Sequence, residues 1–354
     1  WSHALASYAK SSELEKQIPY WQKVQESVMQ LQLPVDFDKD TDSDFSNAII
    51  LSLTAEETTA LLQRVPKAYR TQINDILLTA LTLAIGDWTK QYSLGLSLEG
   101  HGREDIIPGI DTSRTIGWFT SIFPVYLKID NPENLGEAIK TIKEELRNIP
   151  SKGIGYSILT YLTKHLDLDL DALSTSTYSS STSSQVNPAL SFNYLGQWDN
   201  TLTYDSIFSF SSESSGSSSA EQNTDSYLLN INSEIIQGVF SISFGYSSNH
   251  YRQETIEKVA QAFIDRLKQI IKHCISDHVF GYTPSDFNQI TLSQASLNIN
   301  FESIVDIESI YPLSPMQSGL LFQALYAPTS DAYFVQSIFE LEREVDAHAL
   351  ESAW

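Results

Sequence analysis

The chain has 354 residues, of which 42% are hydrophobic, and this size and composition predict a sizeable buried core. The formal net charge is −22, from 44 acidic and 22 basic residues, so the surface would repel nucleic acid and anionic membranes. The single cysteine, Cys274, excludes an intrachain disulfide, and no apolar run is long enough to cross a membrane. We therefore expect a cytoplasmic protein with neither nucleic acid nor a membrane as a partner.

Hydrophobic periodicity predicts helices and strands that alternate along the chain. In chain order, the expected elements are a helix over 1–30, a strand over 47–53, a helix opening at 54–57, a buried helix over 74–90, strands over 92–98 and 121–129, a helix over 135–149, an apolar block at 190–198, a hairpin over 227–235 and 239–246, and a helix over 252–274. Thr54 and Glu57 have the spacing of a capping box, and Pro150 ends the helix before it. This alternation predicts a mixed α/β protein, and the sequence holds no Gly-rich phosphate loop and no metal-ligand cluster.

Several stretches lack a regular apolar pattern. The acid-rich stretch 31–46 and the stretch 281–306 are typical of linkers, and the Ser-rich stretches 174–184 and 206–219 predict mobile surface loops. The chain starts at Trp1 without a methionine and stops where a helical pattern has barely begun. We therefore expect a fragment of a longer polypeptide.

Residues 98–104 read LEGHGRE and directly follow the strand predicted over 92–98. The stretch combines two carboxylates, a histidine, an arginine and two glycines. Taken alone, such a stretch is more often a solvated turn of alternating charge than a catalytic site. The alternative is that Glu99 lies beside apolar strand residues, where burial would raise its pKa toward about 6–7, the range suited to a general base.

Four further blocks accompany this stretch in a fixed order. They are YRTQINDILLTAL at 69–81, RTIGWFTSIFPV at 114–125, PSKGIGYSILTYL at 150–162 and SFNYLGQW at 191–198. In this order and spacing, the five blocks resemble the epimerization domains of nonribosomal peptide synthetases over about residues 1–285. The resemblance implies the two-lobe fold of condensation domains and chloramphenicol acetyltransferase. This chain would supply mainly the C-terminal lobe, an α/β structure whose mixed sheet is covered by helices.

The resemblance also implies a division into segments. They are the end of the N-terminal lobe and the crossover at 1–44, the C-terminal lobe at 45–285, a linker at 286–306 and the truncated start of a condensation domain at 307–354. The last assignment rests on DIESIYPLSPMQSGLLFQALY from Asp306, which resembles the opening block of condensation domains. GYTPSDF at 281–287 resembles the usual exit from an epimerization domain.

The family's reaction inverts the α-carbon of an aminoacyl or peptidyl thioester carried on phosphopantetheine. The resemblance therefore implies two partners, a peptidyl carrier protein and the adjoining condensation domain, and no directly bound cofactor or metal. Glu99 matches the family's catalytic glutamate, and Asn193 and Tyr194 match residues implicated near the α-carbon. An amide could donate a hydrogen bond to an enolate oxygen, and a phenol could relay a proton. For Tyr194, a place in a buried strand remains the alternative.

Further residues of these blocks are expected to bind substrate or to orient the loop: Gly100, His101, Gly102, Arg103 and Arg114. The two glycines would let the backbone turn sharply and approach a thioester. Arg103 is expected to pair with Glu104, and Arg114 either positions Glu99 or forms a structural ion pair. The aromatic residues Trp118 and Phe119 are expected in the core rather than in contact with substrate.

Two other functions remain open. Condensation-type acyl transfer is disfavoured because condensation domains do not normally carry LEGHGRE at this place. A non-catalytic module that only binds a carrier protein is disfavoured because Glu99, Asn193 and Tyr194 are all retained. The sequence contains no His-His pair, so the HHxxxDG motif that supplies the opposite face of the site in family members is absent. We therefore expect the fragment alone to be inactive.

Overall fold

The computed structural model describes residues 1–37, 47–163, 188–198, 213, 216, 227–301, 304–328, 335–340 and 344–354. The Ser-rich stretch 174–184 lies outside these ranges, as do 206–219 apart from Glu213 and Gly216, and residues 38–46 of the acid-rich stretch. The chain divides into two compact units, residues 1–286 with 293–305, and residues 287–292 with 306–354. The first unit contains the sheet and all the residues expected to be functional.

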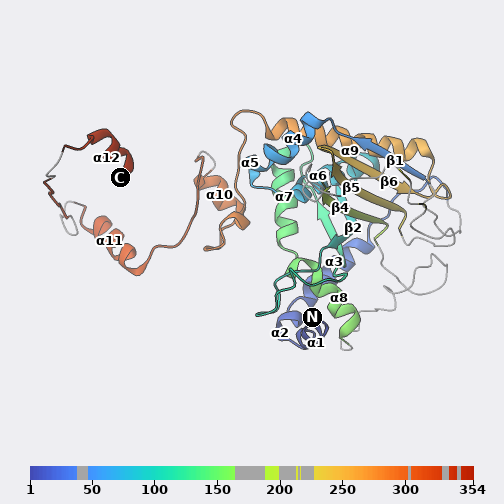
Figure 1. Cartoon of the computed structure of the whole chain (residues 1–354), viewed down its shortest axis with the longest axis horizontal. Coiled ribbons are helices and arrows are strands. Elements are labelled where there is room, and N and C mark those ends of the chain that lie inside the picture. Colours follow the sequence, from blue (N-terminus) through green and yellow to red (C-terminus); the bar gives the residue numbers. More distant parts are fainter. Residues whose placement is uncertain are drawn as a thin grey trace. The chain divides into compact units, whose positions relative to one another are not determined.

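The first unit is built around one six-stranded mixed sheet (Figure 1). Its strands, in spatial order, are β1 (Asn47–Ser52), β6 (Val239–Tyr246), β5 (Leu229–Ile236), β4 (Leu190–Gln197), β2 (Ser93–Gly100) and β3 (Ser121–Lys128). The pairs β5–β4 and β4–β2 are parallel, and the other pairs are antiparallel. The hairpin β5–β6 turns through Gln237 and Gly238, which both have positive φ, as a tight turn that matches strand twist requires.

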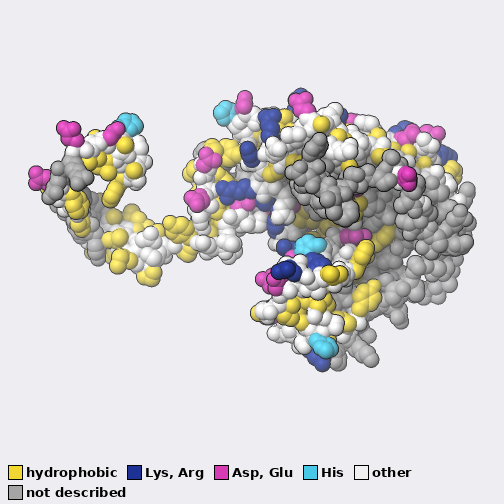
Figure 2. All heavy atoms as spheres, viewed as in Figure 1, with side chains coloured by type: hydrophobic (Ala, Val, Ile, Leu, Met, Phe, Trp, Pro, Cys, Tyr) yellow, Lys and Arg dark blue, Asp and Glu magenta, His cyan; other side chains and the backbone are white. Residues whose placement is uncertain are grey.

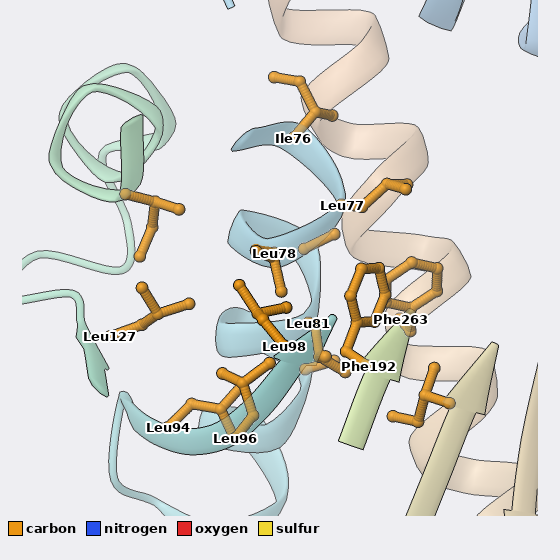
Figure 3. Packing of buried hydrophobic residues seen from close by; sticks show 14 of the residues in the cluster. Ile76, Leu77, Leu78, Leu81, Leu94, Leu96, Leu98, Leu127, Phe192 and Phe263 are labelled. Carbon is orange, nitrogen blue, oxygen red and sulfur yellow. The ribbon is translucent and has the colours of Figure 1, made fainter. Parts of the chain in front are cut away.

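Helices α6 (Ile73–Thr89) and α9 (Gln253–Cys274) pack against each other and against the sheet, α6 on β2 and α9 on β1 and β6. Three leucines of β2, at positions 94, 96 and 98, are buried and face α6 around Leu78 and Leu81 (Figure 3). Phe192 of β4 and Phe263 of α9 belong to the same core (Figure 3). Because side chains alternate along a strand, the residues between these leucines point to the opposite face of the sheet.

The remaining helices frame this core. In unit 1 they are α1 (Ser2–Tyr8), α2 (Ser12–Glu15), α3 (Ile18–Met29), α4 (Ala55–Gln63), α5 (Val65–Tyr69), α7 (Leu135–Arg147), the 3₁₀ helix η1 (Pro150–Gly153), α8 (Ile154–Leu162), the 3₁₀ helix η4 (Pro284–Asp286) and α10 (Gln294–Phe301). Unit 2 contains α11 (Pro315–Tyr326) and α12 (Ala347–Ala353). A side chain at Gly95 would meet Val28 and Leu31, so α3 and the residues after it cover the start of β2 on the face away from α6.

The predicted mixed α/β fold is confirmed, and most elements lie within a few residues of their expected bounds. The single helix expected over 1–30 is instead three helices, separated by short turns after Tyr8 and Glu15. The stretch 281–306, expected as a linker, contains η4 and α10, and Leu297 of α10 is buried. Cys274 is buried at the end of α9, as its apolar neighbours predict.

The strong acidic excess does not form one continuous field on the visible surface. Figure 2 shows acidic and basic side chains interspersed over that face of the molecule. Among the described residues, no helix is both long and apolar enough to cross a membrane.

Two buried ion pairs connect distant parts of unit 1. Asp75 near the start of α6 accepts two hydrogen bonds from the Arg147 guanidinium, at 3.0 and 2.8 Å, and one from the backbone N–H of Gln72 at 2.7 Å. Lys143 of α7 donates to Asp286 at 2.6 Å and to the backbone carbonyl of Tyr69 at 2.8 Å. Both carboxylates are withdrawn from water, so each depends on its cation.

Replacing Asp75 with alanine should lower the free energy of unfolding by about 3 kcal/mol, because it removes a helix cap and leaves Arg147 without its partner. The matched control is Glu13→Ala, which breaks the exposed pair between Glu13 and Lys16 and should cost less than about 0.5 kcal/mol. Urea unfolding of both variants checks this, and equal losses would contradict it.

Candidate active site

Glu99 is the second-last residue of β2, on the face of the sheet opposite the buried leucines. Its side chain is exposed, yet neighbouring atoms remove enough water that partial burial raises the pKa of the carboxyl group above its ordinary value. A raised pKa makes the carboxylate a stronger base than a fully solvated glutamate. The position therefore has the character expected of a general base.

Asn193 of β4 donates a hydrogen bond from Nδ2 to Oε2 of Glu99, at 2.8 Å. The two residues are 94 positions apart in sequence and meet because β2 and β4 run parallel, with Leu98 opposite Phe192. One residue further along each strand, both side chains turn to the same face of the sheet. The structure thus brings together two of the three residues expected at the reacting carbon.

Tyr194, the third of these residues, lies one position further along β4 and packs against the hydrophobic core. Burial raises the pKa of its phenol. Alternation along the strand directs Tyr194 to the side opposite Asn193, so the structure does not place it with Glu99. A shift in strand register between Tyr194 and Gln197 follows directly after it.

The loop after β2 turns at Gly102, where φ is +64°. A Cβ atom at this position would lie 1.6 Å from the carbonyl oxygen of Phe119, so no larger residue fits without moving the backbone. Gly100 is different, because it is the last strand residue and its φ is not positive. Only Gly102 therefore supplies the sharp turn that the sequence suggested for both glycines.

Arg103 holds the two ends of this loop together. Its guanidinium donates to the backbone carbonyls of Thr112 and of Gly117, the latter at 3.3 Å, and stacks 4.0 Å from the ring centre of Phe119. Arg103 therefore does not form the ion pair expected with Glu104.

Glu104 pairs instead with two other side chains. Its Oε1 lies 3.0 Å from Nε2 of His101, and its Oε2 lies 3.0 Å from Nζ of Lys152, in η1. The Nδ1 atom of His101 accepts a hydrogen bond from the backbone N–H of Arg103 at 3.0 Å. This pattern suits an imidazole that is protonated on Nε2.

The outer part of the loop is exposed. Trp118 is 90% exposed, which makes the expectation of a core position wrong, while Phe119 is half-buried under Arg103. Arg114 is also exposed, and within the described residues it forms no ion pair, so neither role expected for it is visible. The apolar stretch around Trp118 predicts a core position for this residue. In the structure, the contacts of Arg103 hold the loop instead, and Trp118 stays exposed.

Lys152 and the amide side chains of β5 also lie at this site, although they were not predicted from the sequence. Asn232 lies opposite Asn193 in the register of β4 with β5 and donates to Asn230 at 2.8 Å. The alternation of Leu-Asn-Ile-Asn at 229–232 could have shown that both asparagines share one face of the sheet. No pattern in the sequence indicates the contact of Lys152 with Glu104. Over the described residues, no group of three or more His, Cys, Asp or Glu side chains could hold a metal ion.

Comparisons with known proteins show the family of this chain. The family model of the condensation domain matches residues 1–289. One of the linear gramicidin synthase proteins of Brevibacillus parabrevis is 40% identical over 100% of this chain, and one of the mycosubtilin synthase proteins of Bacillus subtilis is 39% identical over 99%. The chain spans only 4% and 13% of the length of these two relatives.

Several solved structures resemble this one, including an epimerization domain and a condensation domain. The epimerization domain from the third module of tyrocidine synthetase B is 38% identical with a TM-score of 0.68, over 78% of this chain and 59% of that one. The condensation domain of the polyketide synthase MokA is 13% identical with a TM-score of 0.53, over 78% of this chain and 60% of that one, which shows a shared fold alone. The chain belongs to the condensation-domain family. The relatives named above are synthase proteins, and this chain matches a small part of each.

Substituting alanine at Gly102 should disrupt the loop more than the same change at Gly109. Both positions have positive φ, but a Cβ atom at Gly109 meets nothing within 4 Å, so that variant carries only backbone strain of about 1 kcal/mol. Gly102→Ala must also displace the carbonyl of Phe119. Limited proteolysis within 101–119 and chemical unfolding compare the two variants. Equal cleavage rates and equal stability losses would refute the steric argument.

Proposed function

We propose that this condensation-type domain epimerizes the α-carbon of an aminoacyl or peptidyl thioester, from the L to the D configuration. The observation that carries the proposal is the Glu99 carboxylate at the end of β2, with its raised pKa and its hydrogen bond to Asn193. The likeness to an epimerization domain at 38% identity supports it. The substrate is held on the phosphopantetheine arm of a peptidyl carrier protein, which is the partner that presents it.

In this mechanism, Glu99 accepts the α-proton as a general base. The electron pair left on carbon delocalises into the thioester carbonyl. A proton then returns to the other face of the carbon from an acid that this chain does not supply, because its sequence lacks the HHxxxDG motif. The amide N–H of Asn193 that now binds Glu99 keeps the carboxylate in place and stabilises its ionised form. Charge on the enolate oxygen needs hydrogen-bond donors, and amide side chains on this face of the sheet are suited to that role.

The segment assignments belong to the same proposal. The C-terminal lobe is residues 45–285, preceded by the end of the N-terminal lobe and the crossover at 1–44. Residues 286–306, which include α10 and its buried Leu297, lead from this lobe to the start of a condensation domain at 307–354. The division between units at Asp306 supports the last boundary.

Amide-bond formation is the alternative that the family allows. Amide-bond formation needs a group that activates an incoming amine, whereas exchange of the α-proton needs only a base close to the α-carbon. Loss of the α-proton to solvent therefore separates the two reactions. The test is solvent deuterium incorporation at Cα of the carrier-bound substrate, measured with the complete synthetase.

In that test, Glu99→Gln should lower the rate of deuterium incorporation by about 10²–10⁴-fold, because glutamine has the size of glutamate but cannot accept the proton. Glu254→Gln, which changes an exposed carboxylate in the first turn of α9, is the matched control and should exchange normally. Wild-type protein that makes peptide bonds without exchanging the α-proton would move the assignment to condensation. Unchanged exchange in Glu99→Gln would remove Glu99 from its role.

Asn193→Ala should move the acid limb of the pH–rate profile to higher pH. Removing the amide takes away a hydrogen bond to the ionised carboxylate, so the pKa of Glu99 rises further. The base works only when deprotonated, and its activity therefore appears at a higher pH than in the wild type. Asn300→Ala is the control, because Asn300 is an exposed amide that donates to the Ser296 carbonyl of its own helix, α10. A limb that stays in place in Asn193→Ala would contradict the role given to this hydrogen bond.

A further inference from the structure

The turn that precedes α8 has an unusual backbone. Ser151 and Lys152 have φ values of +47° and +50°, and Gly153 follows at +91°. The left-handed region is costly for residues with a side chain, and two consecutive examples without glycine are uncommon. Such strain persists only where surrounding contacts determine the conformation.

Contacts on two sides hold this turn. Gln17, which is buried, donates from Nε2 to the hydroxyl of Ser151 at 3.1 Å. On the other side, the ammonium of Lys152 reaches Glu104 at 3.0 Å. The backbone is fitted closely as well, since a Cβ atom at Gly153 would lie 2.1 Å from the ring of Phe123. The left-handed backbone at Lys152 is therefore what directs its side chain to the loop after β2.

Glu104 is the receiving end of this contact. Its side chain is only 11% exposed, whereas Lys152 and His101 are 76% and 64% exposed. The carboxylate is therefore the buried member of the group and has one cation or imidazole on each oxygen. A carboxylate so far removed from water depends on both partners. Glu104 thus ties the loop that begins at Gly100 to the turn at Lys152.

We propose that Lys152 and Glu104 are positioning residues for Glu99, holding the loop after β2 so that the carboxylate keeps its place at the end of the strand. This inference rests on the proposed epimerization, because it gives the ion pair the role of holding the base of that reaction, Glu99, in place. Neither residue touches the reacting carbon. Their effect on the position of Glu99 is transmitted by the backbone at 100–104. Gly102 and Arg103 lie against Phe119 and so connect this backbone to the far end of the loop.

Variants at Lys152 and Glu104 separate the effect of the ion pair from the effect of the strained backbone. Lys152→Ala removes the ammonium and keeps the left-handed backbone, while Lys152→Gly removes the ammonium and relieves the strain. Lys152→Arg keeps the positive charge, and Glu104→Gln removes the negative one. Lys128→Ala is the matched control, because it breaks an exposed ion pair with Asp130 elsewhere in the same sheet.

The first measurement is amide hydrogen exchange of the segment 100–119 in the complete synthetase. We expect about tenfold faster exchange in Lys152→Ala, Lys152→Gly and Glu104→Gln, and wild-type protection in Lys152→Arg and Lys128→Ala. Chemical unfolding of Lys152→Gly, in which the backbone strain is relieved, should give nearly the wild-type stability, which shows that the loss of protection at 100–119 is local. Unchanged protection in all three variants would overturn the inference, whatever the catalytic activity.

The second measurement is α-proton exchange with the carrier-bound substrate. The three loosened variants should lose about tenfold in kcat with KM nearly unchanged, because a displaced base affects the chemical step rather than binding. Lys152→Arg should restore kcat. A double variant, Lys152→Ala with Glu104→Gln, should lose no more than the worse single variant, since both act through one contact.

The two measurements distinguish the two proposals. A loosened loop with wild-type kcat would overturn the positioning role while leaving epimerization intact. A wild-type synthetase that exchanges no α-proton would end the proposed function, and the ion pair would then be judged by the protection of 100–119 alone.

Discussion

The packing of β2 on α6 is the constraint on which the candidate site depends. Leu94, Leu96 and Leu98 are committed to the core by burial against the helix. A slip of one residue would place all three on the opposite face and carry Glu99 into the apolar interior. The free energy of burying leucines thus fixes where the carboxylate points, because roughly 1.5–3 kcal/mol is at stake for each side chain.

The parallel pairing of β2 with β4 then brings Asn193 to Glu99. β3, α7 and α8 lie between β2 and β4 in the chain, so the meeting of Glu99 with Asn193 depends on the register of the sheet rather than on local sequence. The same alternation explains why Tyr194 lies apart from Asn193 although the two are neighbours in the chain. Adjacent residues of a strand face opposite sides of the sheet. A motif that contains Asn193 and Tyr194 therefore supplies one side chain to the site and the other to the core.

Much of the fold could be predicted from the sequence. α6 and α9 have long apolar patterns, and β5 and β6 alternate clearly around a turn, so their bounds were nearly right. The loop after β2 could also be singled out from the sequence, because five ordered blocks resemble one family. Their contacts were not: Arg103 binds backbone carbonyls and Phe119 rather than Glu104, and Trp118 is exposed. Those contacts depend on how distant segments fold back, which neither periodicity nor spacing encodes. Lys152 is the plainest case, since its side chain reaches Glu104 only through a strained backbone.

The pair of Lys143 with Asp286 has a consequence for dividing this polypeptide. Asp286 is held at 2.6 Å by an ammonium that is itself only 2% exposed. A cut or fusion made between residues 143 and 286 would separate the carboxylate from the ammonium and leave a lone cation in the interior, where the cost is several kcal/mol. Asp286 therefore has to stay with Lys143 when the chain is divided, even though the sheet and α9 end well before it. A boundary drawn directly after α9 would break this charge neutralisation.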